Sequence, residues 1–168
     1  MEQKLFSENW ENQLELQFIS DDPSRVRAYI CSPLKADTSE EYLLNMYAAR
    51  AYMFYAKEKL GYAACAPHAY LPMLLGDNNR SDRALAIHFG LKLLERSQVL
   101  LVCGNRMSFG MRGEIAYAGS LKKRIIVFDE RLLCEVRKIV GTNRSVIYSA
   151  VLLKGHPAMA HPRPQIQY

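Results

Sequence analysis

The chain has 168 residues, of which 49% are hydrophobic and 23% charged, as is usual for a globular protein. This length suits one domain with a substantial core. The net charge of +5 suits a ligand that carries phosphate. No dense block of Lys and Arg with interleaved aromatic residues is present, which argues against nucleic-acid binding.

Two further classes are disfavoured by what the sequence lacks. No apolar stretch is long enough to span a membrane, and residues 1–13 have no signal-peptide pattern, so we expect a cytoplasmic protein without a membrane partner. The four cysteines lie far apart with no CxxC spacing, which predicts free thiols. No metal site is predicted, because His156 and His161 near the carboxyl terminus have no companion ligands at a suitable spacing.

The composition divides the chain into three parts. Residues 1–24 are polar with scattered apolar side chains, and we expect an arm that packs on the domain or on a second subunit. Within this arm, the run from Asp21 to Ser24 predicts a turn. Residues 25–154 are predicted to form an α/β domain. Residues 155–168 carry three prolines and are predicted to be an extended tail.

The first predicted strand is Val26–Cys31. Thr38 and Glu41 then have the spacing of a capping box, which predicts a helix over residues 38–60. The apolar residues at near-helical spacing in this helix are Leu43, Met46, Tyr47, Ala51, Phe54 and Leu60. The second predicted strand is Tyr62–Ala66.

The next stretch is less regular, with a short helix predicted over Leu71–Leu75 and a turn over residues 76–79. Ser81 or Asp82 is expected to cap a helix that runs to about Arg96. The predicted inner stripe of this helix is Leu85, Phe89 and Leu93.

A short run of aliphatic residues, Val99–Cys103, predicts a strand that is buried on both faces. The predicted loop that follows, Gly104–Gly113, holds three glycines, which allow tight turns or a close approach to a ligand. Glu114 is expected in the first turn of the next helix. The remaining predicted elements are the strand Ile125–Phe128, the helix Glu130–Val140 and a last strand, Val146–Leu153.

Strands and helices alternate with short connections, which indicates a three-layer α/β/α domain with a parallel sheet of about five strands. Ligands of such sheets bind in the crevice beyond the carboxyl ends of the strands. The loop Gly104–Gly113 is therefore expected to form the floor of a ligand crevice.

Three segments together carry a family resemblance. The string SFGMRGEIAYA at residues 108–118 looks like the active-site segment of the nucleoside 2-deoxyribosyltransferases and their relatives. The strings YICSP at residues 29–33 and APH at residues 66–68 resemble the ends of the same families' first two strands, so the likeness covers about residues 26–128. It implies a flavodoxin-like fold, a nucleoside or nucleotide ligand, no metal or organic cofactor, and a homo-oligomer.

The resemblance also implies a chemistry for Glu114. The matching glutamate attacks the anomeric carbon of the sugar and displaces the base, and a second base or water resolves the glycosyl-enzyme, as in a retaining glycosidase. A position at the amino terminus of a helix favours the ionised carboxylate that such a nucleophile needs. The competing interpretation is that Glu114 only complements the helix dipole.

Two departures from the family pattern bear on this chemistry. Ser108 stands where many of the transferases have aspartate, and a serine there is similar to the 2′-deoxynucleoside 5′-phosphate N-hydrolases, in which it helps to hold the phosphate. The family's acid for the leaving base falls by spacing near Gly90, where this chain has no acid, and Asp82 and His88 are the substitutes to consider. General-acid assistance contributes about two to four powers of ten in rate.

The remaining candidate residues lie in loops at the same predicted sheet edge. The candidates for a phosphate cradle are Ser32, Lys35, Arg106, Ser108 and Arg112, each of which could instead be an ordinary solvated loop residue. Ser32 and Pro33 are expected to form one wall of the crevice, and Gly110 and Met111 to shape the sugar or phosphate site. His68 either lines the crevice or is a structural histidine.

The favoured hypothesis is an enzyme that cleaves or exchanges the N-glycosidic bond of a nucleoside or nucleotide, with Glu114 as nucleophile. The alternative is a non-catalytic nucleotide-binding module, such as a sensor, which the missing acid near Gly90 motivates. A flavin-binding protein is a weaker third hypothesis, because the loop from Ser32 to Lys35 lacks the run of small hydroxyl residues that would wrap a flavin phosphate.

Overall fold

A computed structural model of the chain describes residue 14 and residues 17–76, 78–141 and 145–150. The predicted tail at residues 155–168, most of the predicted arm and the last part of the predicted strand Val146–Leu153 lie outside the described residues.

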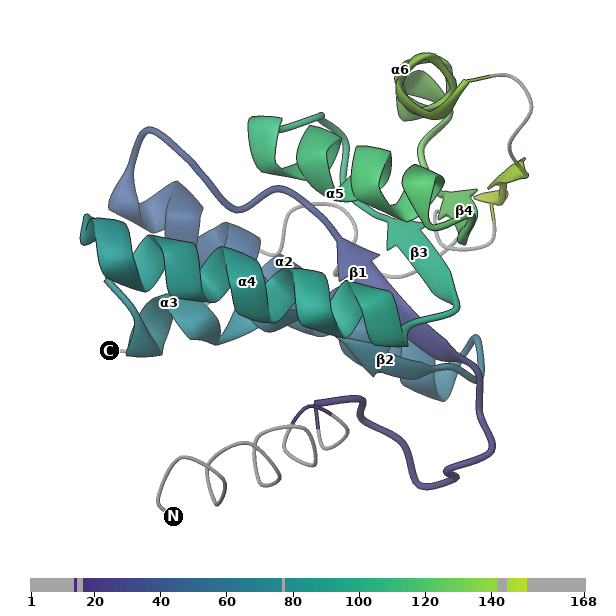
Figure 1. Cartoon of the computed structure of the whole chain (residues 1–168), viewed down its shortest axis with the longest axis horizontal. Coiled ribbons are helices and arrows are strands. Elements are labelled where there is room, and N and C mark those ends of the chain that lie inside the picture. The colour runs from purple at the N-terminus through teal and green to yellow at the C-terminus, as the bar shows by residue number, and fades with distance from the viewer. Residues whose placement is uncertain (1–13, 15–16, 77, 142–144, 151–168) are drawn as a thin grey trace.

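The core of the protein is a sheet of five parallel strands, as the sequence predicted (Figure 1). The strands are β1 (Arg27–Cys31), β2 (Ala63–Cys65), β3 (Val99–Val102), β4 (Arg124–Val127) and β5 (Val146–Tyr148). Their spatial order is β2-β1-β3-β4-β5, which is the order of flavodoxin-like sheets. From β1 the chain adds β2 on one side and β3 on the other, so the order of the strands reverses between β1 and β3. Ligand sites of such folds lie at that point.

Helices cover both faces of the sheet and complete the predicted three-layer α/β/α arrangement. They are α2 (Ser39–Glu58), η1 (Pro67–Ala69), α3 (Leu71–Leu74), α4 (Arg80–Arg96), α5 (Phe109–Ser120) and α6 (Glu130–Val140). Because strand residues alternate between faces, Tyr29 and Cys31 pack with α4, α5 and α6, whereas Ala28 and Ile30 pack with α2. In Figure 1, α4 lies on the viewer's side and α2 behind it.

The inner face of α2 differs from the predicted stripe. The side chain of Thr38 caps the helix as expected, accepting a hydrogen bond from the Glu41 backbone N–H at 3.1 Å. The buried residues are Met46, Ala49, Tyr52, Met53 and Ala56, whereas Leu43, Tyr47 and Phe54 are exposed. The predicted set spread around the helix and favoured large side chains. The observed set follows the helical period and uses small alanines where the helix meets the sheet.

The start of α4 also differs from the prediction. Asn79 caps the helix and accepts a hydrogen bond from the backbone N–H of Ser81 at 3.0 Å, so Ser81 and Asp82 lie inside the first turn. The side chain of Leu85, predicted to face inward, is exposed, while Leu93 is buried and Phe89 packs against the core. The buried residues of α4 are Gly90, Leu93 and Leu94, so its later turns are the part that packs in the core.

The helix that carries Glu114 begins earlier than the glycine-rich sequence predicted. Ser108 is the amino-terminal cap of α5, and its hydroxyl accepts a hydrogen bond from the Met111 backbone N–H at 3.3 Å. Gly110 and Gly113 are therefore helical, and Glu114 lies in the second turn instead of the first. The cap and the packing of α5 on the sheet outweigh the low helix propensity of glycine.

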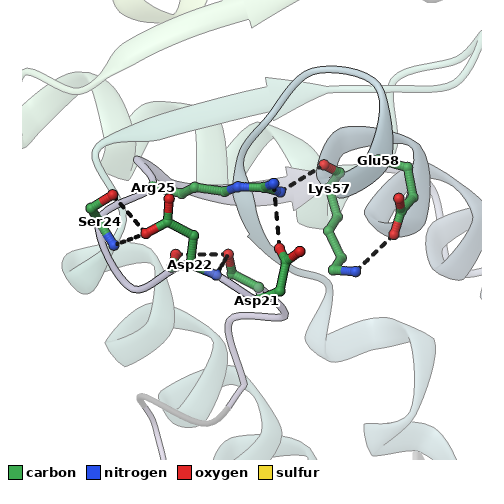
Figure 2. Close-up of polar contacts among 7 residues, drawn as sticks. Asp21, Asp22, Ser24, Arg25, Lys57 and Glu58 are labelled. Atoms are coloured by element: carbon green, nitrogen blue, oxygen red, sulfur yellow. Dashed lines mark hydrogen bonds and ion pairs between the residues drawn. The ribbon is translucent and has the colours of Figure 1, made fainter.

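The chain enters the sheet through the predicted turn at residues 21–24 (Figure 2). The carboxylate of Asp22 accepts hydrogen bonds from the Ser24 backbone N–H at 2.8 Å and from its hydroxyl at 2.6 Å. The guanidinium of Arg25 donates to the carbonyl of Lys57 at 3.0 Å and lies 3.3 Å from the Asp21 carboxylate. These contacts tie the turn to the end of α2 and set the start of β1.

Part of the arm packs on the domain itself. Leu14 and Phe18 are buried in the core on the side of α4 and α5. Ile19 forms an isolated antiparallel bridge with Ala64 at the β2 edge of the sheet. The described end of the arm thus covers one edge of the sheet.

All four cysteines lie in the described part of the chain. Cys31, Cys65 and Cys103 are buried free thiols, and Cys134 is an exposed one. No helix in the described part is long and apolar enough to cross a bilayer.

Two glycines of α5 give a matched test of the packing of α5 against α6. A Cβ atom at position 119 would lie 2.9 Å from Cγ1 of Val140 on α6, whereas one at position 113 would meet nothing within 4 Å. We expect Gly119→Ala to lower the free energy of unfolding by about 1–3 kcal/mol through overpacking. Gly113→Ala should raise it by up to about 1 kcal/mol, because alanine is the better helix former. Urea denaturation of both variants checks the pair, and equal effects would contradict the α5–α6 contact.

Candidate functional site

A cavity of about 630 Å³ opens at the carboxyl edge of the sheet, beyond the ends of β1 and β2 and beside the start of α5. It is lined by Tyr29, Ser32, Leu34, Lys35 and Tyr42, by Pro67, His68, Leu71, Pro72, Leu75 and Gly76, by Asp82, Arg83, Ala86, Ile87, Gly90 and Leu91, and by Ser108, Phe109, Gly110, Met111, Gly113, Glu114 and Tyr117. The volume suits a small organic ligand of nucleotide size. The cavity lies at the carboxyl edge of the sheet, where the sequence predicted a ligand crevice, and at the point where the strand order reverses. Of the predicted floor, Gly104–Gly113, residues 108–111 and 113 line it.

A hydrogen bond between two elements distant in sequence anchors the cavity. The hydroxyl of Tyr29 on β1 donates to Oε1 of Glu114 on α5 at 2.7 Å. The tyrosine side chain is only 1% exposed, so the sheet holds this donor in a fixed place. The cavity therefore contains a carboxyl group whose orientation is set by the core of the protein.

Burial controls the protonation of this carboxyl group. It raises the pKa of Glu114 to about 7, although the hydrogen bonds from Tyr29 and Cys31 act in the opposite direction. The expectation that a helix amino terminus would favour the ionised form is therefore wrong, because Glu114 lies a turn further along the helix and its desolvation outweighs the hydrogen bonds to it. Near neutral pH this side chain exchanges readily between acid and base forms, which is a property of catalytic carboxyl groups.

A second polar pair lies in the same cavity. Oγ of Ser32, which follows β1, and Nε2 of His68 in η1 share a hydrogen bond of 2.7 Å. Burial lowers the pKa of His68 to about 4, so the imidazole is neutral at physiological pH. The pair therefore offers the ligand hydrogen-bonding groups without a charge.

The structure brings together some of the predicted site residues and separates others. Of the predicted residues, those that line the cavity are Ser32, Lys35, His68, Ser108, Gly110, Met111 and Glu114. Pro33 is buried behind the wall, where its Cδ would lie 2.8 Å from a Cβ atom at Gly104, whose φ of +94° favours glycine. The prediction that Pro33 forms part of the cavity wall is therefore wrong, since its ring packs against Gly104 instead.

The two arginines of the predicted phosphate cradle are engaged outside the cavity. The guanidinium of Arg106 donates to the Lys35 carbonyl at 2.7 Å and lies 3.7 Å from the Glu41 carboxylate. That of Arg112 contacts the Glu135 carboxylate at 2.6 Å. The start of α5 at Phe109 turns position 112 toward α6, which the predicted loop did not foresee. Within the described cavity, the cradle candidates that remain are Ser32, Lys35 and Ser108.

Where α4 lines the cavity at position 90, it has no side chain. Gly90 stands where the family's acid was expected, and a Cβ atom there would lie 3.2 Å from the Tyr29 hydroxyl. Of the two possible substitutes, Asp82 lines the cavity and accepts a hydrogen bond from the Gly76 backbone N–H at 3.0 Å, whereas His88 is exposed and does not line it.

Sequence reasoning missed several lining residues. Tyr29 could have been found from its place two residues before Cys31, because alternate strand residues share a face and that face meets α5. The apolar wall could not have been found in this way, since its residues come from the irregular stretch after β2 and from the middle of α4. These wall residues are Leu71, Pro72, Leu75, Ile87 and Leu91.

The arrangement suits the chemistry of one carboxyl group acting on an organic ligand. A half-buried carboxyl group lies with the Tyr29 hydroxyl and the Ser32–His68 pair in a cavity whose remaining wall is largely apolar, with Lys35, Asp82 and Arg83 as its other charged side chains. Among the described residues, no group of three or more His, Cys, Asp and Glu side chains is placed to hold a metal ion.

The raised pKa of Glu114 predicts a specific dependence of stability on pH. Because the folded-state pKa of about 7 lies above the model-peptide value of 4.5, folding favours the protonated form, and stability is lost as pH rises between these values. Glu114→Gln removes this loss. We expect the free energy of unfolding of the variant, relative to that of the wild type, to rise by up to roughly 3 kcal/mol between pH 4 and pH 8. Urea denaturation across this range checks the prediction, and parallel pH profiles would contradict it.

Comparison with known proteins gives a family and no named relative. A search of curated proteins finds no match. A family of domains of unknown function, DUF7768, matches residues 26–128, which run from the start of β1 to the end of β4 and include Tyr29, His68, Gly90 and Glu114. The match covers more than half of the chain and its whole set of cavity-forming elements, so this protein belongs to the DUF7768 family.

Proposed function

We propose that this protein is an enzyme that breaks or exchanges the N-glycosidic bond of a nucleoside or nucleotide, as the resemblance to the nucleoside 2-deoxyribosyltransferases implies. The observation that carries the proposal is the carboxyl group of Glu114, held by Tyr29 inside a ligand-sized cavity at the point where the strand order reverses. A carboxylate that only complemented the helix dipole would not need this enclosure.

The proposed reaction has two displacements at the anomeric carbon. An oxygen of the ionised Glu114 attacks this carbon while the bond to the base nitrogen breaks, and the base leaves with the electron pair and acquires a proton. Water or a second base then attacks the same carbon, breaks the ester bond to Glu114 and regenerates the carboxylate. Water gives a free sugar and a second base gives a new nucleoside, and in both cases the attacking group releases a proton to solvent.

The neighbouring groups have distinct roles in this scheme. Tyr29 and Cys31 hold the Glu114 carboxyl group in place at the cavity wall. Ser32 with His68, and Ser108 with Lys35, offer donors for the sugar hydroxyls or a phosphate, with Lys35 supplying the positive charge. The apolar wall between α3 and α4 suits the faces of a base.

A non-catalytic nucleotide-binding module remains the second candidate, and one observation favours it. Position 90 holds a glycine packed against Tyr29, so no carboxyl group approaches the leaving base from this turn of α4. Asp82 is the acid on α4 that reaches the cavity, two helical turns away. If it does not protonate the base, binding without turnover is the outcome.

Substitution of the nucleophile separates the two candidates. With a panel of ribo- and deoxynucleosides and their 5′-monophosphates, we expect the wild type to release or exchange base and Glu114→Gln to be at least about a thousandfold slower. Glu130→Gln, at an exposed glutamate on α6, serves as the matched control and should retain wild-type activity. Chromatography of the bases gives the rates. Saturable binding without base release by the wild type would establish the binding module instead.

The pH profile of the reaction gives an independent check. Because the nucleophile must be ionised and its pKa is about 7, kcat/KM should rise about tenfold per pH unit below pH 7 and level off above it. Initial rates between pH 5 and pH 9 measure this. A profile that falls through pH 7 would mean that Glu114 acts as an acid, which contradicts its role as nucleophile.

A further inference from the structure

The glycine at position 90 is set against the hydroxyl that holds Glu114. Gly90 is a buried residue in the interior of α4, where glycine is normally less favourable than alanine. A Cβ atom at this position would lie 3.2 Å from the Tyr29 hydroxyl oxygen and 3.9 Å from Cγ of Pro67. The first distance is shorter than an ordinary van der Waals contact between carbon and oxygen, so Tyr29 would have to move.

The tyrosine has little freedom to accommodate such a neighbour. Its side chain is 1% exposed, and β1 pairs with β2 on one side and with β3 on the other. The hydroxyl already lies 2.7 Å from Oε1 of Glu114, the usual length of such a bond, so it cannot retreat toward the carboxylate. The remaining movement takes the hydroxyl off the line of its hydrogen bond.

We propose that Gly90 is a positioning residue for the site: its missing side chain leaves the space in which the Tyr29 hydroxyl reaches Glu114. The bearing of this arrangement on catalysis rests on the proposed function, but the hydrogen bond that it protects does not.

Ionisable groups reach the cavity around Glu114 from several elements. The charged side chains of Lys35, Asp82 and Arg83 line it, and His68 is neutral because burial lowers its pKa to about 4. Those that face Glu114 from the strands are Tyr29 and Cys31 on β1 and Cys65 on β2, and burial raises the pKa of all three well above the usual range. On α5 itself, the Tyr117 hydroxyl donates to Glu95 at 2.6 Å. Burial is the main cause of the raised pKa of Glu114, and the hydrogen bonds from Tyr29 and Cys31 lower it, so loss of the Tyr29 bond should raise this pKa further.

The test is a double-mutant cycle read through this pKa. The pKa of Glu114 is measured in the full chain by NMR titration of ¹³C-labelled glutamate carboxyl groups, with the Glu114→Gln spectrum identifying the signal. Tyr29→Phe, which removes the donor, should raise the pKa by about 1 to 2 units. Gly90→Ala should raise it in the same direction by a smaller amount, and Gly90→Val by nearly as much as Tyr29→Phe.

The decisive comparison is made in the Tyr29→Phe background. With the hydroxyl absent, Gly90→Ala has nothing to displace, so it should leave the pKa of Glu114 unchanged. It should also raise the denaturation midpoint there, as Gly113→Ala is expected to do in the wild type, since the ordinary helix preference of alanine is then unopposed. This gain in the Tyr29→Phe background shows that the substitution is tolerated by the fold.

Two results would overturn the proposal. One is an unchanged pKa of Glu114 in Gly90→Ala and Gly90→Val, which would mean that Tyr29 adjusts without losing its hydrogen bond. The other is an equal shift with and without the Tyr29 hydroxyl, which would mean that position 90 acts on Glu114 by another route. Neither readout requires turnover, so the absence of enzyme activity would refute the proposed function and leave this inference standing.

Discussion

A carboxyl group kept from water at the end of the sheet is the constraint on which the site depends. Raising the pKa of Glu114 from 4.5 to about 7 corresponds to at most roughly 3 kcal/mol at neutral pH, which is a large part of the usual stability of a domain. The hydrogen bond from Tyr29 limits this cost. The sheet then supplies rigidity, because Tyr29 lies on a strand paired on both sides, and Gly90 supplies room for its hydroxyl.

The sequence was sufficient for the fold because each strand has a simple local signal. The runs Val99–Val102 and 125–127 are aliphatic and buried, and the alternation of strands with helices indicates a parallel sheet. The carboxyl-edge position of the site followed from that topology alone. Glu114, Ser32 and Ser108 could be placed in one cavity for the same reason.

Other features depend on tertiary contacts that a local pattern does not contain. Glycines at positions 110 and 113 indicated a loop, whereas the cap by Ser108 and packing on the sheet start the helix earlier. That shift moves Glu114 to the second turn and directs Arg112 to Glu135. The role of Tyr29 depends on a contact with Glu114, 85 positions away in the sequence. The fit of Gly90 against the Tyr29 hydroxyl becomes visible only in the three-dimensional structure.

The most direct test of the central claim is to observe the covalent intermediate. The wild type is mixed with a deoxynucleoside or its 5′-monophosphate, quenched in acid within the first turnover, and examined by intact-protein mass spectrometry and peptide mapping. The account predicts one added sugar or sugar phosphate, on the peptide that contains Glu114, and none in Glu114→Gln. Base release without an adduct on this residue, or an adduct on a different residue, would contradict it.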